Sequence, residues 1–185
     1  MNLEEQKNII NHYKENWILE DPYFITLEKG PMKEHYPEFT ILVNPPTKNR
    51  DMWTYATVGM SDTENDSIEL HLFSEIENDD LVEILTVVAY YKLTENKIGL
   101  DDTVNFGKSW LPNSNCDYGL ISLPYLDGEK LEKLKIDNKQ ISFYWLIPIT
   151  KNERDYRWKF GIEKLEELFE KKQINYLDPN RKSLV

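Results

Sequence analysis

Acidic side chains gather between two predicted strands and are the most prominent groups able to bind a ligand. Carboxylates alternate at Asp62, Glu64 and Asp66, and Glu69 follows them. Alternating carboxylates can hold Ca²⁺, but an EF-hand loop needs a glycine at its sixth position and a helix on each side. Here that position is Ser67 and both flanks are predicted strands, so we expect a solvated hairpin loop and no metal site.

The single cysteine, Cys116, is the candidate nucleophile. A catalytic thiol needs a nearby base or positive charge that lowers its pKa. The histidines fall on a predicted helix, a loop and a strand, and none belongs to a catalytic motif (His12, His35 and His71). We therefore expect a structural thiol. A lone cysteine cannot form an internal disulfide, which is typical of proteins from the reducing cytosol.

Other catalytic motifs are missing from the sequence. It has no GxSxG elbow and no glycine-rich phosphate loop, so we expect neither a serine nucleophile nor a cofactor. The remaining enzymatic hypothesis is a carboxylate site in which Asp101, Asp102 or Glu69 acts in a pocket between helix and sheet. The pair Asp101-Asp102 is also typical of a turn, and we favour that interpretation.

The charge balance restricts the partners that the chain can bind. Its 185 residues contain 22 Lys and Arg against 33 Asp and Glu, a net charge of −11. Such a surface repels phosphate backbones, and we expect no nucleic-acid binding. It would attract a basic partner, although acidic charge also serves solubility alone. The charged N-terminal segment is not a signal peptide and the apolar runs are too short to span a membrane, so a cytoplasmic location is predicted.

The elements that position these groups follow from hydrophobic periodicity. Helices are predicted over 3–19, 79–96 and 150–172, and strands over 39–43, 53–58, 68–73, 118–123 and 141–149. Residues 23–37 and 97–117 are expected to be irregular. This order predicts a single α+β domain over 1–185, with a mixed, largely antiparallel sheet flanked by helices.

Three elements carry more specific predictions. The helix over 79–96 is apolar nearly all round, which favours a central, buried position. The strand over 141–149 is apolar on both faces and is expected in the middle of the sheet. The last helix starts with a Thr150–Glu153 capping box. It is expected to bury one stripe of side chains, namely Trp158, Ile162, Leu165 and Phe169.

Several segments together resemble the suppressor-of-fused domain family. They are TYATVGMSD followed by IELHLF, then GKSWLP, YGLISLPY, ISFYWLIPITKNE and LDPNRKSLV, and they span roughly 38–185. The resemblance implies an α/β or α+β domain with a mixed sheet. It also implies a non-enzymatic protein that binds other proteins.

What the family does differs between its members. In animals this domain is half of a larger protein that sequesters a transcription factor by adding a short peptide of it as a β-strand between two domains. We expect no second half in this chain, so the clamp cannot be carried over whole. Stand-alone bacterial members are proposed to be immunity factors that bind and mask secreted toxins.

The first hypothesis is therefore an immunity-like protein that masks a protein partner, such as a basic toxin or effector, by direct contact. The candidate contact surface comprises the hairpin turn, the acidic loop and one tryptophan, namely Met60, Ser61, Asp62, Glu64, Asp66 and Trp110. Each also has a structural interpretation, because a turn needs Gly59 and a tryptophan can fill a core. The alternative is an intracellular scaffold with a non-toxin partner.

Overall fold

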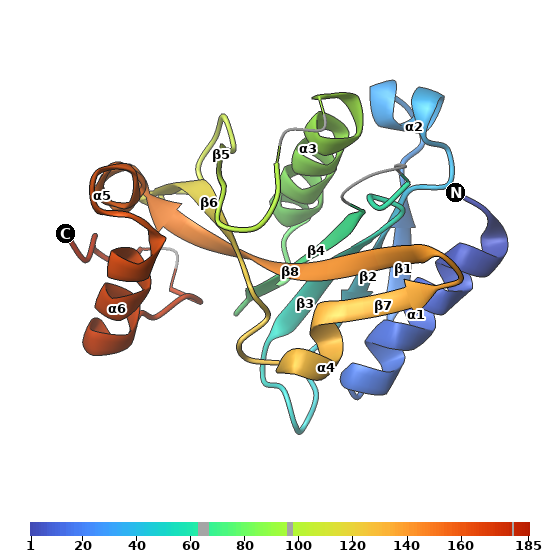
Figure 1. The fold of residues 1–185 in the computed structure, drawn as a ribbon, viewed down its shortest axis with the longest axis horizontal. Coiled ribbons are helices and arrows are strands. Elements are labelled where there is room, and N and C mark those ends of the chain that lie inside the picture. Colours follow the sequence, from blue (N-terminus) through green and yellow to red (C-terminus); the bar gives the residue numbers. More distant parts are fainter. Residues whose placement is uncertain (63–66, 96–97, 179) are drawn as a thin grey trace.

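An eight-stranded sheet forms the middle of the computed structural model, which describes residues 1–62, 67–95, 98–178 and 180–185 (Figure 1). The strands are β1 (Tyr23–Thr26), β2 (Thr40–Asn44), β3 (Trp53–Val58), β4 (Ile68–Ser74), β5 (Thr103–Asn105), β6 (Cys116–Ser122), β7 (Lys133–Ile136) and β8 (Lys139–Thr150). Their spatial order is β1-β2-β3-β4-β8-β6-β5, and β7 also pairs with β8. Only β4 and β8 run parallel among the described pairs, which confirms a mixed, largely antiparallel sheet.

Helices cover both faces of this sheet. They are α1 (Leu3–Asn16), α2 (Pro31–His35), α3 (Asp79–Glu95), α4 (Glu129–Glu132), α5 (Lys151–Phe160) and α6 (Ile162–Lys172). One face packs against α3, whereas α1 and α6 pack on the opposite face, at opposite ends of the sheet (Figure 1). The predicted α+β domain is confirmed.

Strand β4 separates its side chains between the two layers, as its alternation predicts. Leu70 and Leu72 pack in the α3 layer, whereas Phe73 packs in the α6 layer. All seven residues of β4 are nevertheless buried, because helices cover both faces of the sheet. The polar residues Glu69 and His71 are therefore interior groups that need partners.

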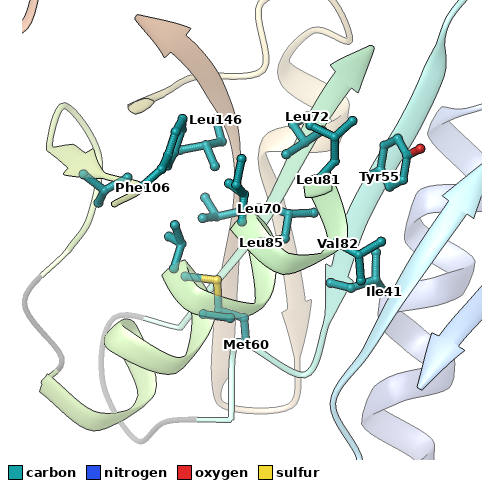
Figure 2. Close-up of a cluster of buried hydrophobic side chains, with 14 of the residues drawn as sticks. Ile41, Tyr55, Met60, Leu70, Leu72, Leu81, Val82, Leu85, Phe106 and Leu146 are labelled. Carbon is teal, nitrogen blue, oxygen red and sulfur yellow. The ribbon is translucent and has the colours of Figure 1, made fainter. Parts of the chain in front are cut away.

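The layer under α3 is the largest apolar cluster (Figure 2). Leu81, Val82 and Leu85 of α3 lie over Leu70 and other sheet residues. The helix has a solvent face as well, since Val87 and Tyr91 are 49% and 44% exposed. The prediction of a helix buried on most sides is therefore wrong: α3 is a covering layer, and part of its apolar surface is exposed.

Strand β8 lies in the middle of the sheet, as predicted. Its first half pairs with β7 and, in parallel, with β4, where Leu70 lies opposite Tyr144. Its second half pairs with β6, where Leu120 lies opposite Ile147. One strand thus joins the N-terminal and C-terminal parts of the sheet.

Some predicted boundaries are wrong. The segments expected to be irregular contain β1, α2 and β5. The single helix predicted over 150–172 is two helices, because Gly161 adopts a φ of 89° that ends α5 and precedes α6. Trp158 consequently leaves the buried stripe and is 63% exposed. The capping box at Thr150 is present as predicted.

Candidate functional site

The hairpin turn after β3 folds around the carboxylate of Glu69. The hydroxyl groups of Thr57 and Ser61 donate to it at 2.5 and 2.7 Å, and the backbone N–H groups of Gly59 and Ser61 donate at 3.0 Å. Burial raises the pKa of Glu69, and these hydrogen bonds oppose that shift. With its oxygens enclosed by the turn, Glu69 organises the hairpin and does not face a pocket.

Most of the predicted contact residues that the structure describes are buried. Met60 and Ser61 are 0% exposed and Trp110 is 1% exposed, so a partner would reach none of these side chains in this conformation. Asp62 lies at the surface, with 37% of its side chain exposed, and pairs with the N-terminal ammonium group at 2.5 Å. Glu64 and Asp66 fall outside the described residues.

The other candidate catalytic groups have structural roles. Asp102 accepts a hydrogen bond from the Gly99 N–H at 2.9 Å, and its own N–H donates to the Gly99 carbonyl at 3.2 Å. Asp101 precedes it with a φ of 69°, so the turn interpretation of this pair is confirmed. Cys116 is 1% exposed, and burial raises the pKa of its thiol, which is opposite to activation. Among the described residues, no cluster of three or more His, Cys, Asp or Glu side chains could hold a metal ion.

A buried ion pair holds the C-terminal segment. The two terminal nitrogens of Arg181 donate to the two oxygens of Glu153 at 2.6 and 2.7 Å, and one also donates to the Pro148 carbonyl at 3.0 Å. The Leu184 N–H donates to Glu153 at 3.0 Å, and the Thr150 N–H donates at 2.8 Å. Burial would raise the pKa of Glu153, but Arg181 and these N–H groups outweigh it and lower that pKa. The capping-box glutamate thus anchors the chain end to β8.

A second buried cluster lies between α1 and β4. Asp127 accepts a hydrogen bond from the Trp17 indole N–H at 2.8 Å and pairs with Arg50, whose guanidinium lies 5.0 Å from the centre of the Phe73 ring. The His71 Nε2 atom lies 3.4 Å from the Asp127 carboxylate. Burial lowers the pKa of His71, and Asp127 opposes that shift. The sequence marks Asp127 only as a turn residue, because its partners come from distant segments.

Two large hollows lie on the described surface. A polar cleft of about 1220 Å³ lies beside the start of α1 and the turn at Asp102. An apolar groove of about 740 Å³ lies between α6 and the end of the sheet formed by β6 and β8. The sequence predicts neither hollow, because their walls come from separate segments.

The fold as a whole agrees with comparisons to known proteins. A family model described as suppressor of fused protein matches residues 35–182. The chain belongs to the suppressor-of-fused family. The resemblance carried by the hairpin, the GKSWLP loop and β8 is thereby confirmed.

Individual members of the suppressor-of-fused family give closer comparisons. A homologue from Neisseria gonorrhoeae FA 1090 is 30% identical, with a TM-score of 0.88 over 100% of this chain and 98% of that chain. The immunity protein YqcF of Bacillus subtilis (strain 168) is 25% identical over 71% of this chain and 74% of its own.

More distant structures show the fold alone. A chain of the Sufu–Fu complex is 14% identical, with a TM-score of 0.72 over 97% of this chain and 92% of that chain. Drosophila Suppressor of Fused is also 14% identical, with a TM-score of 0.69. The match covers 100% of the present chain but only 54% of the Drosophila chain.

Proposed function

We propose that this suppressor-of-fused domain is a non-enzymatic, cytoplasmic protein that binds a protein partner and masks it, as an immunity protein does. The observation that carries the proposal is the engagement of its reactive groups: Glu69, Asp102 and Cys116 all serve the fold. The relationship to an immunity protein of Bacillus subtilis supports the same conclusion.

The expected mechanism is steric, with electrostatic guidance. A net charge of −11 creates a field that speeds the approach of a basic partner and penalises an acidic one. Once bound, the rigid sheet with its helical layers would cover the partner's functional surface. Of the contact residues predicted from the sequence, Asp62 is the described one whose side chain remains accessible.

The test is reconstitution with a secreted effector from the native host. The effector is identified by capture on the immobilised domain, and the complex is then rebuilt from the two purified proteins. We expect a stable complex, loss of the effector's toxic activity, and restored growth when both proteins are produced together. Capture of housekeeping proteins alone, with no protection against any effector of the host, would contradict the proposal.

A further inference from the structure

The apolar groove beside α6 has the properties of a docking site. Leu120, Trp145 and Ile147 of the sheet and Phe169 of α6 pack together as its buried floor. Tyr176 of the segment after α6 also lines the groove and packs edge-on against Trp145, with the ring centres 4.8 Å apart. The groove is open and has a volume of about 740 Å³. This is large enough for several side chains of a bound segment.

Exposed apolar side chains extend this surface at the mouth of the groove. Tyr125 and Leu126 line it and are 60% and 46% exposed. They follow β6 in a turn fixed by backbone hydrogen bonds from Asp127 and Gly128 to Pro124, at 2.8 and 2.9 Å. Large apolar side chains held in place at the edge of an apolar hollow are typical of a protein-binding surface.

The charge around the groove has one sign. Glu163, Glu166, Glu167 and Glu170 line it from α6, at the three- and four-residue spacing that places them on one face of the helix. No lysine, arginine or histidine is found among the described residues that line it. Lys164, which lies outside the groove, pairs with Glu167 at 2.7 Å.

The remaining glutamates have little compensation. Glu166 accepts a hydrogen bond from the Tyr125 hydroxyl at 3.2 Å, a neutral donor. Like charges at this spacing repel one another and destabilise the helix that carries them. A cation placed along this face would relieve the repulsion, so the groove favours a positively charged occupant.

From this combination we infer that the groove binds a segment of a protein partner in which apolar side chains lie beside lysine or arginine. The inference rests on the proposed function and names the surface and the chemistry through which it would act. Apolar side chains would pack on Tyr125 and Leu126 above the buried floor of the groove, and the basic side chains would lie along the glutamate row. The same row repels nucleic acids and anionic lipids, and a neutral small molecule would leave it unused.

The direct test uses designed peptides and fluorescence anisotropy. The probe is a labelled peptide of about 14 residues, made of leucine and lysine with the leucines on one helical face. One matched peptide has glutamate in place of lysine, and another has serine in place of leucine. We expect the leucine–lysine peptide to bind, more weakly as salt is raised, and the two matched peptides to lose binding.

A pair of triple variants locates the site. Glu163→Gln, Glu166→Gln and Glu170→Gln together should weaken binding of the leucine–lysine peptide about tenfold, because three partly exposed ion pairs are lost. The control carries Glu15→Gln, Glu34→Gln and Glu75→Gln, which remove the same charge from exposed positions outside the groove. Equal binding by both variants, or equal binding of the leucine–glutamate peptide, would overturn the inference.

The effector identified above separates this inference from the proposed function. Loss of protection in the groove variant, with protection intact in the control variant, supports both. Full protection by the groove variant would overturn the groove as the docking site and leave the masking function standing. Failure of the unaltered protein to protect would reject the masking function, whatever the peptides show.

Discussion

Replacement of Arg181 by methionine tests whether a buried ion pair holds the C-terminal segment on the sheet. The Arg181 guanidinium donates to both Glu153 oxygens, at 2.6 and 2.7 Å, and to the Pro148 carbonyl at 3.0 Å. Arg181→Met keeps a long apolar stem and removes these donors. The change therefore isolates the charged hydrogen bonds from most of the packing.

The expected cost follows from the burial of the remaining partner. Glu153 is 0% exposed, and the variant leaves its carboxylate with the N–H groups of Thr150 and Leu184 as its remaining hydrogen-bond donors. Removal of one partner from a buried ion pair costs about 3–5 kcal/mol in the free energy of unfolding. For a domain of this length each kcal/mol lowers Tm by about 2–4 °C, so we expect a fall of roughly 6–20 °C.

The cost should also depend on pH. Since Arg181 and the N–H groups hold the pKa of Glu153 below its usual value of 4.5, the folded state binds this proton less readily than the unfolded state. The ionised carboxylate therefore contributes stability above pH 4.5, and this contribution is lost as the pH falls through the lowered pKa. The difference between the unaltered protein and Arg181→Met should shrink in the same direction.

The assay is urea unfolding, followed by tryptophan fluorescence, at neutral pH and again in acid below the usual pKa of glutamate. Lys171→Met is the control, because it removes a positive charge from an exposed position on α6. A cost below about 1 kcal/mol at neutral pH, as for a surface ion pair, would refute the reasoning. So would a cost that stays the same in acid.

Three further predictions concern the interior. Gly119→Ala would place a Cβ atom 2.6 Å from the Leu146 side chain and 2.7 Å from the Phe106 ring, so it should cost about 1–3 kcal/mol in urea unfolding; an unchanged midpoint would contradict the close packing. Because burial lowers the pKa of His71, the free energy of unfolding should fall as the pH drops below 6.5. In urea unfolding between about pH 8 and pH 5.5, His71→Gln should show a weaker pH dependence than the unaltered protein; the same pH dependence in both proteins would contradict this prediction. The Cys116 thiol should react with a coloured disulfide reagent only as the protein unfolds, and rapid reaction of the folded protein would show that it is accessible.

The sequence predicts the central strands well because their signals are local. The run from Trp53 to Val58 matches β3, and the alternation from Ile68 onward separates the two faces of β4. The short edge elements are missed because they carry weaker signals. Strand β1 has four residues, of which one is half-buried and the others are exposed, so it has little apolar alternation to recognise. The break at Gly161 has a local cause, a glycine with positive φ, and could have been recognised from the sequence.

The candidate surface is harder to predict, because burial depends on contacts between distant segments. From the sequence, Met60 and Ser61 are expected in an exposed turn. In the structure they are buried, because the turn folds over the Glu69 carboxylate and bonds to it. The groove brings together Leu120, Trp145 and the segment around Phe169, which no local pattern connects. The signal that was available is the row of glutamates on α6, which matters only once an apolar wall is known to lie beside it.

The position of β8 has a consequence for synthesis of the chain on the ribosome. Ile68 of β4 pairs with Ser142, so one edge of β4 stays unpaired until residues far later in the chain have been made. An apolar strand with a free edge is prone to pair with other chains. Nascent chains that stop before Lys139 should therefore expose this edge and depend on chaperones. Addition of β8 would end this period of exposure, because β8 pairs with the free edge of β4 and joins both parts of the sheet in one step.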